Sequence, residues 1–404
     1  MMLGALGFGA VGFSILGTVI GLQVFAIRGS TRDLGLVGLA QFLPILVLSP
    51  FTGTVADRFD RRWVYATGLA IMTASAAGLL LYATTDPTNV WPFFLLMGIN
   101  GVGRAVGTPA SRSLPIDLAP EDLLERIVAV RSLAFQAAII IGPLIGGFAN
   151  RASTVLPFVL IIAAQIMAFL LLLQVAKPAT AKLDTVAGPR QALRDAVEGL
   201  WFIRRSQIVL GAITLDLFAV LFGGAVALLP AIVEERLGVS DIDLGVAIMR
   251  SSIGAAAALT ALTLSIRPLT RNAGKTLFAV IAIFGAATIV LGVTRNYGVA
   301  IAAVAVLSAA DQISVFIRAT VVPLATPESM RGRVLAVENV FIGGSNELGA
   351  WESGETAAWF GLGPAVVIGG IGTLVVVGVG WFAFPELRNV DRFAEVKPVP
   401  VAPT

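Results

Sequence analysis

Ionisable side chains stand inside the long apolar segments of this 404-residue sequence, where they could bind protons or line an internal cavity. Charge at bilayer depth costs several kcal/mol and normally faces a protein interior or a water-filled cavity. Asp311 and Glu347 are the leading candidates for proton coupling, because they fall near the middle of their segments and carboxylate stems are too short to reach the membrane surface. The full set of candidates is Arg104, Asp216, Arg250, Asp311, Glu347, Glu352 and Glu355.

These charges also have structural interpretations. An Asp–Arg pair can hold two helices together without touching a ligand, and a protonated carboxyl can hydrogen-bond between helices. Arg318 lies about two turns from the end of its segment, so its long side chain could instead extend to the membrane surface. Glu338 is expected at the cytoplasmic end of its segment.

The composition predicts an all-α integral membrane protein. Hydrophobic residues make up 57% of the chain and charged residues only 13%, whereas soluble domains average about 25% charged residues. A membrane-spanning helix needs roughly 20 mostly apolar residues, and the continuous apolar runs do not alternate as barrel strands do. The predicted spans are 3–27, 35–56, 63–83, 91–115, 127–149, 154–176, 207–230, 244–266, 276–294, 298–325, 334–360 and 365–385.

Residue types that are absent exclude several kinds of chemistry. The chain has no Cys and no His, so disulfides, thiol nucleophiles, His relays and the common metal sites are excluded. We expect no cofactor and no metal. Lys and Arg concentrate in the connections on one side of the predicted spans, which indicates that both termini are cytoplasmic rather than that the chain binds nucleic acid. The first span is expected to be a retained helix, not a signal peptide.

Two six-helix halves are predicted, at 1–176 and 207–385, with a cytoplasmic tail at 386–404. The polar linker 177–206 contains "PRQALRDAVEGLWFIRR", in which Leu193, Val197, Leu200 and Trp201 lie opposite Arg194, Asp195 and Glu198 on a helix. We expect this helix to lie on the inner membrane surface. "LAPEDLLERIVAV" (118–130) and "LATPESMRGRVLAV" (324–337) repeat between the fourth and fifth spans of each half. Such duplication is typical of secondary transporters.

A charged stretch, "GTVADRFDRR" at 53–62, interrupts the apolar pattern between the second and third spans. With the twelve spans and the duplicated halves, it makes the chain resemble the major facilitator superfamily, whose loop pattern is G-x-x-x-D-R-x-G-R-R/K. Asp60 stands where that pattern has its second glycine. The resemblance implies a cytoplasmic gate that closes when the cavity faces outward, although the arginines also serve as topology signals. The matching residues are Gly53, Asp57, Arg58, Arg61 and Arg62.

The fifth span contains "GPLIGG", which resembles the end of the family's antiporter signature and favours export. Its residues are Gly142, Pro143, Gly146 and Gly147. The alternative is a kink made of Pro and small residues for tight helix packing. "LDLFAVLFGGAVALLP" and "GSNELGAWESG" resemble the bacterial siderophore and drug efflux branch that includes the enterobactin exporter. The resemblance to that branch implies siderophore export or multidrug resistance, and a place in the bacterial cytoplasmic (inner) membrane.

We therefore expect a monomeric secondary transporter that exports a small amphipathic molecule, a siderophore or a drug, in exchange for protons by alternating access. Its expected partners are this substrate, protons and the lipid bilayer. A proton-coupled importer or a lipid flippase would use the same charges. A membrane-embedded enzyme is disfavoured, because the repeat and the charged loop have no role in such chemistry, and the ATP-binding pattern GxxxxGK[ST] is absent.

Overall fold

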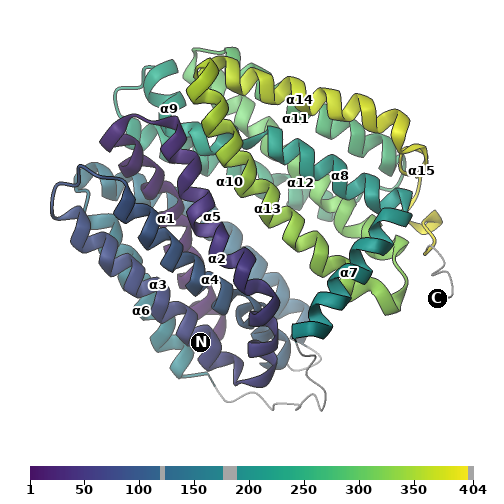
Figure 1. Ribbon diagram of the computed structural model, residues 1–404, viewed down its shortest axis with the longest axis horizontal. Coiled ribbons are helices and arrows are strands. Elements are labelled where there is room, and N and C mark those ends of the chain that lie inside the picture. The colour runs from purple at the N-terminus through teal and green to yellow at the C-terminus, as the bar shows by residue number, and fades with distance from the viewer. Residues whose placement is uncertain (119–122, 176–188, 399–404) are drawn as a thin grey trace. The chain divides into compact units, whose positions relative to one another are not determined.

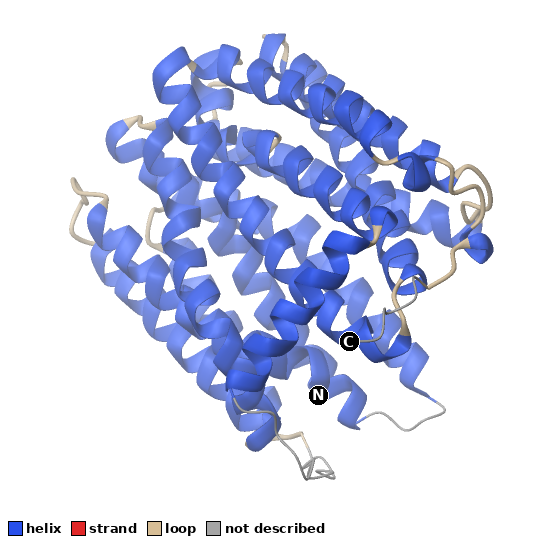
Figure 2. Cartoon of the chain, turned by 45° about the vertical axis from the view of Figure 1, so that its right-hand side comes forward, coloured by secondary structure: helices blue, strands red, loops and turns tan. Residues whose placement is uncertain are grey.

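A computed structural model describes residues 1–118, 123–175 and 189–398, and within these ranges every regular element is a helix (Figure 2). Figure 1 labels most of the helices. The long helices are α1 (Met2–Arg28), α2 (Thr31–Arg58), α3 (Arg61–Ala83), α4 (Trp91–Leu118), α5 (Leu124–Ala152), α6 (Leu156–Leu173), α7 (Pro189–Arg205), α8 (Gln207–Phe222), α10 (Ile242–Ile266), α11 (Ala273–Val293), α12 (Tyr297–Ala325), α13 (Glu328–Phe360) and α14 (Leu362–Ala383). The short ones are η2 (Gly224–Leu228), α9 (Leu229–Ala231), η3 (Ile232–Arg236), α15 (Pro385–Arg388) and η4 (Phe393–Glu395).

Each predicted span coincides with a helix, and the predicted fold class is confirmed. The predicted span at 207–230 lies within one helical stretch, Gln207–Arg236, but this stretch is not a single continuous α-helix. α8 ends at Phe222, and a 3-10 turn, one short α-turn and a π-turn follow it. The break falls at Gly223 and Gly224, where a Cβ on Gly224 would collide with the backbone of Gly349 in α13. Glycine permits both this close approach and the change of helix type.

Ten helical stretches of the described residues are long and apolar enough to cross a membrane. The two other helices of that length are α4 and α13. α13 carries the acids Glu338, Glu347, Glu352 and Glu355, so its composition is closer to that of a helix with a polar face. α13 also begins at Glu328, earlier than the predicted 334, because its first six residues, ESMRGR, are helical but too polar to be counted in an apolar span.

The chain divides into two compact units, each with its own core. Unit 1 comprises residues 1–190 and 239–251, and unit 2 comprises residues 191–238 and 252–404. In unit 1, α1 packs against α5 and α6, while α4 packs against α2 and α3. Ile15 and Val19 of α1 share one apolar cluster with Phe158 of α6.

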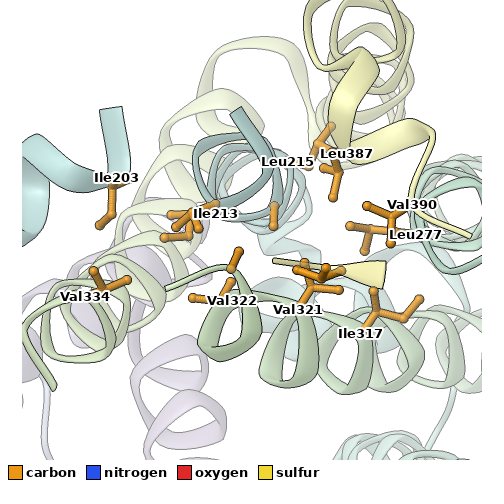
Figure 3. Close-up of a cluster of buried hydrophobic side chains, with 14 of the residues drawn as sticks. Ile203, Ile213, Leu215, Leu277, Ile317, Val321, Val322, Val334, Leu387 and Val390 are labelled. Atoms are coloured by element: carbon orange, nitrogen blue, oxygen red, sulfur yellow. The ribbon is translucent and has the colours of Figure 1, made fainter. Parts of the chain in front are cut away.

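The core of unit 2 gathers around α8, which contacts α12, α13 and α14. Ile213 and Leu215 of α8 lie in a cluster with Leu277 of α11 and Val322 of α12 (Figure 3). Three of these side chains are fully buried and Ile213 is 5% exposed. Since lipid is as apolar as these side chains, tight packing rather than removal from water holds such helices together.

Apolar side chains at helical spacing cover the outer faces of α6 and α14. On α14 the exposed series includes Ile371, Val375, Val379 and Phe382, the last at 81% exposure. Spacing of three or four residues places these side chains on one face of the helix. This is the surface expected of a helix that faces lipid.

Candidate functional site

A buried cluster of charges joins three helices of unit 2. Arg318 of α12 lies with Nη2 2.7 Å from Oδ1 of Asp216 in α8. Its Nη1 lies 3.6 Å from Oε1 of Glu338 in α13. All three side chains are at most 8% exposed. One guanidinium therefore bridges carboxyls from two other helices.

The spacing along α12 brings further polar groups to this cluster. Asp311, Ser314 and Arg318 are separated by three and four residues, so they lie along one face of the helix. Ser314 is 3% exposed, and its Oγ has no hydrogen-bond partner. The Nε of Arg318 is likewise buried without a partner. Buried polar atoms without a partner are rare and call for an explanation, such as a bound water or ion.

A small pocket lies where these groups meet. Asp216, Asp311 and Ser314 supply its polar lining, and side chains of α8 and α11, including Phe284, supply the apolar lining. About 10 Å³ is available to the centre of a water molecule, which is room for about one water. The pocket thus sets two carboxyls and one unpartnered hydroxyl around a site of that size.

The cluster contains more acid than base. Among the residues that the structure describes, Asp216 and Glu338 share the guanidinium of Arg318, and the third carboxyl, that of Asp311, lies with Asp216 at the pocket. Leaving charge uncompensated in the interior costs several kcal/mol per ion. With all three carboxyls ionised the cluster would carry two uncompensated negative charges, so binding of protons or of a cation is favoured there, and that is the chemistry on which ion coupling depends.

The other predicted acids of α13 lie apart from this pocket. Glu347, Glu352 and Glu355 are half-buried, and none of them is among the residues that line it. Glu352 Oε1 accepts a hydrogen bond from Thr356 Oγ1 at 2.8 Å. Of the predicted proton-coupling residues, the structure brings Asp216 and Asp311 together and leaves Glu347 elsewhere on α13.

Both predicted intramembrane arginines of unit 1 lie against α1. The Cζ of Arg104 in α4 lies 4.4 Å from the ring centroid of Phe13. A Cβ built on Gly17 would lie 3.8 Å from Nη1 of Arg250, whose Nε is buried without a hydrogen-bond partner. Arg104 of α4 and Arg250 of α10 thus lie against neighbouring positions of α1.

The charged loop at 53–62 is described in part. The burial of Gly53 and the side chain of Asp57 lie outside what the structure describes, and Arg58 is exposed at the end of α2. Asp60 accepts a hydrogen bond from the backbone N–H of Arg62 and so caps α3. Its φ of −58° is open to any residue, which explains why aspartate can replace glycine here.

Arg62 ties this loop to the end of α6. Its Nη2 lies 2.7 Å from Oδ2 of Asp60, and its Nη1 donates to the carbonyl oxygen of Val175 at 2.7 Å. Val175 lies two residues beyond the last residue of α6, so this hydrogen bond holds the chain just after the helix. Arg61, the other arginine of the loop, begins α3.

The glycines of the fifth-span motif are positions of close packing. A Cβ on Gly142 would lie 2.5 Å from Cβ of Ser14 in α1, and one on Gly146 would lie 3.2 Å from Cγ2 of Val19. A Cβ on Gly147 would lie 2.5 Å from Cβ of Ala247, in the part of α10 that belongs to unit 1. Pro143 is buried inside α5. These contacts support the packing interpretation of the motif.

Polar contacts within unit 1 continue beyond these glycines. The amide of Gln23 donates to Oδ1 of Asn150 at 2.8 Å, and Nδ2 of Asn150 donates to Oδ1 of Asp243 at 2.8 Å. Nε of Arg151 lies 3.0 Å from Oδ2 of Asp241. The end of α5 is therefore bonded both to α1 and to the start of α10.

Sequence reasoning missed the central member of the buried cluster. Arg318 was left open between a role in the site and extension to the membrane surface and was not among the candidate site residues, yet it is 4% exposed and is paired with Asp216. Glu338 is 6% exposed and shares the same guanidinium. The available signal was the seven-residue interval between Asp311 and Arg318, which puts both on one helix face.

Known proteins resemble this chain in sequence and in fold. It is 28% identical over 203 residues to the uncharacterized MFS-type transporter YfiS of Bacillus subtilis. The aligned segment covers 48% of this chain and 45% of YfiS. It is 29% identical over 150 residues to the quinolone resistance protein NorA of Staphylococcus aureus. This aligned segment covers 37% of each chain. The matched segments thus span less than half of these relatives.

Solved transporter structures share the fold over nearly the whole chain. The nucleoside transporter NupG superposes with a TM-score of 0.78 at 13% identity, covering 95% of this chain and 99% of NupG. A D-xylose-proton symporter gives a TM-score of 0.73 at 19% identity, with 98% of both chains covered. A profile of the Major Facilitator Superfamily matches residues 2–350. This chain, a multi-pass membrane protein, therefore belongs to the Major Facilitator Superfamily of transporters, which are not enzymes.

Proposed function

We propose that the protein is a proton-driven exporter of a small amphipathic molecule. The observation that carries this proposal is the buried excess of carboxyls around Arg318, with Asp216 and Asp311 at one small pocket. Such a cluster can change its charge by one proton without a cofactor. The protein acts as a monomer in a bacterial inner membrane, with both termini in the cytoplasm and with 1–176 and 207–385 as its moving halves.

The coupling step is the protonation of Asp216, the closer of the two carboxyl partners of Arg318. While Asp216 is ionised, its 2.7 Å contact with Arg318 holds α8 to α12. A proton that enters from outside through Asp311 and the pocket neutralises Asp216 and weakens this contact. α8 and α12 are then free to shift, and release of the proton to the cytoplasm restores the ion pair.

The direction of transport rests on two observations. The "GPLIGG" segment matches part of an antiporter signature, and NorA, a relative, is named for quinolone resistance. Both favour export of a drug-like molecule, and the resemblance to the siderophore efflux branch adds siderophores as the second substrate class. The alternatives are a proton-coupled importer and a lipid flippase, in which the same cluster would drive a different cargo.

The cytoplasmic gate at 53–62 completes the proposed cycle. Gly53 permits close approach of a second helix, and Asp57 with Arg58, Arg61 and Arg62 forms a weak electrostatic latch that closes in the outward-facing state. Interactions of charges with helix ends contribute about 0.3–2 kcal/mol each, so such a latch opens in every cycle. The described contacts of Arg62 with Asp60 and Val175 are compatible with this role.

Flux measurements in proteoliposomes test the proposal. Wild-type protein is expected to expel a quinolone, norfloxacin, faster when a pH gradient is imposed. Asp216→Asn and Asp311→Asn should lose the effect of the gradient yet still exchange norfloxacin down its own gradient, because a neutral amide imitates the protonated carboxyl. Glu352→Gln, outside the pocket, is the matched control. Full gradient dependence in both aspartate variants would contradict the mechanism, and Glu347→Gln would then be examined.

A further inference from the structure

Ser314 is the exception among the serine and threonine hydroxyls of α12. Ser308 donates its hydroxyl to the carbonyl oxygen of Ile253 at 2.8 Å, and Thr320 donates to that of Phe316 at 2.9 Å. Ser314 is 3% exposed, and among the residues that the structure describes its Oγ has no hydrogen-bond partner. A serine inside a helix can bond to a carbonyl of the preceding turn. The Ser314 hydroxyl does not do so and is available to another partner.

This hydroxyl opens onto the small pocket of unit 2. Ser314 lines the pocket together with Asp311 of α12 and Asp216 of α8. Asp311 and Ser314 are three residues apart, so they lie on one face of the helix, about 4.5 Å apart along its axis. About 10 Å³ is available to the centre of a water molecule. A buried water needs about two to four polar partners, and these three side chains supply that number.

The rest of the pocket favours water over a metal cation. A hard metal cation requires about six oxygen ligands, which is more than two carboxyls and one hydroxyl offer. One of those carboxyl oxygens, Oδ1 of Asp216, is already 2.7 Å from the positively charged Arg318. The other lining residues are apolar and add no side-chain oxygen: Ala219, Val220, Val280, Ile281, Phe284 and Ala310.

We propose that Ser314 holds one water molecule between Asp311 and Asp216, and that this water passes the proton from the first carboxyl to the second. Protonated Asp311 and the Ser314 hydroxyl both donate hydrogen bonds to the water, which donates to the Asp216 carboxylate. The O–H bond of Asp311 breaks and one forms at Asp216, while the water gains one proton and gives up another. The relay rests on the proposed transport function, but the water site does not.

The charged groups around this path come from few elements. Arg318 and, through it, Glu338 of α13 lie next to Asp216. α11 turns apolar side chains to the pocket, and its one charged residue, Lys275, is exposed in the first turn. α14 packs against α8 and has no charged residue, and α15 contacts α8 at Gly211, more than one turn before Asp216. A proton delivered by the water therefore acts directly on the partner of Arg318.

Radiolytic labelling tests the water site without any transport. Pulsed X-rays convert a bound water into a hydroxyl radical, which hydroxylates an adjacent aromatic ring. Phe284 lines the pocket, whereas Phe278 of the same helix packs edge-on against Trp381. In the full-length protein in neutral detergent we expect labelling of Phe284 and not of Phe278. Ser314→Ala should lower the labelling of Phe284 about threefold to tenfold, since a lost hydrogen bond has that magnitude.

Norfloxacin flux in proteoliposomes tests the relay. Ser314→Ala should lower the ratio of gradient-driven efflux to exchange down the norfloxacin gradient about threefold to tenfold, because the water is held less well between the carboxyls. Ser314→Thr keeps the hydroxyl and should restore most of this ratio. Ser308→Ala removes the bonded hydroxyl of the same helix, so it should lower the unfolding temperature but change neither the ratio nor the labelling of Phe284. A purely structural role of Ser314 would lower both fluxes together.

The outcomes separate the water site, the relay and the proposed function. Labelling of Phe284 that is absent, or that survives Ser314→Ala, would overturn the water site. Thermal stabilisation by sodium chloride but not by choline chloride, if lost in Ser314→Ala, would overturn it too, because the pocket would then hold a cation. An unchanged flux ratio in Ser314→Ala would overturn the relay. Wild-type flux that ignores the pH gradient, together with Ser314-dependent labelling, would count against the proposed function and not against the water site.

Discussion

The Arg318 guanidinium lies 2.7 Å from the Asp216 carboxylate and 3.6 Å from that of Glu338, so Asp216 is its closer partner. Arg318 and Asp216 are 5% and 6% exposed at their side chains. In such surroundings an ion pair is weakly stabilising as a whole, but removing one partner leaves the other charge uncompensated. The pair can therefore couple proton binding to helix position.

This relationship predicts a strong energetic coupling between the two residues. Arg318→Gln should lower the free energy of unfolding by about 3–5 kcal/mol, because it strands buried carboxyls. Asp216→Asn should also destabilise, and the double variant should be less unstable than the sum of the single effects by about 0.5–3 kcal/mol. Unfolding in detergent, followed by circular dichroism, measures all four proteins. Strict additivity would mean that the 2.7 Å contact between Arg318 and Asp216 contributes no coupling energy.

The sequence predicted the helices far better than the cluster. Apolar length and polar punctuation fix where a helix can cross a membrane, so spans such as 63–83 agree with α3 (Arg61–Ala83) to within two residues. Whether a buried side chain points toward a neighbouring helix depends on helix rotation and packing, which hydropathy does not encode. For Arg318 the sequence therefore left open both a role in the site and extension to the membrane surface, and only the packing of α12 against α8 shows its partner, Asp216. Asp216 and Asp311 were identified because carboxyls so far from an interface have few alternatives.

A second prediction concerns the attachment of α7 to α13 within unit 2. Nε of Arg333 lies 3.0 Å from Oδ1 of Asp195, and its Nη1 lies 2.8 Å from Oε2 of Glu198. These groups are roughly one-third exposed, so each pair contributes only about 0.2–1 kcal/mol. Arg333→Ala should increase hydrogen exchange in α7 with little change in overall stability.

Two further substitutions complete this test. Gly199→Val should loosen α7 more than Arg333→Ala, because a Cβ at Gly199 would lie 2.9 Å from the carbonyl oxygen of Arg333. Arg194→Ala removes the exposed pair between Arg194 and Glu198 and serves as the control. Unchanged exchange in α7 of the Gly199 variant would show that the close contact does not hold the helix.

A third prediction follows from the cap of α3. Asp60→Gly restores the family's glycine but removes the hydrogen bond to the Arg62 N–H and the 2.7 Å ion pair with Arg62. Because φ at this position is −58°, glycine brings no conformational benefit. We expect a loss of about 0.5–1 kcal/mol, since a glycine cap costs only a few tenths and the ion pair adds the remainder. Asp60→Asn keeps the cap and should lose less, and a more stable glycine variant would refute this role of Asp60.

The last prediction tests whether the fifth-span glycines serve only helix packing or also the transport cycle. Gly142→Ala places a Cβ 2.5 Å from that of Ser14 and 3.3 Å from the backbone nitrogen of Ile15. Because the backbone of α1 cannot yield locally, α5 must move away, and overpacking of this kind costs about 1–3 kcal/mol. Gly378→Ala in α14, where nothing lies within 4 Å of the new Cβ, is the matched control. It should be neutral or stabilising by up to about 1 kcal/mol, the difference in helix propensity between the two residues. Thermal unfolding of both variants, followed by norfloxacin flux at a temperature where each is folded, distinguishes the two interpretations. If Gly142→Ala folds as well as Gly378→Ala but has lost transport, the motif has a role in the transport cycle beyond packing.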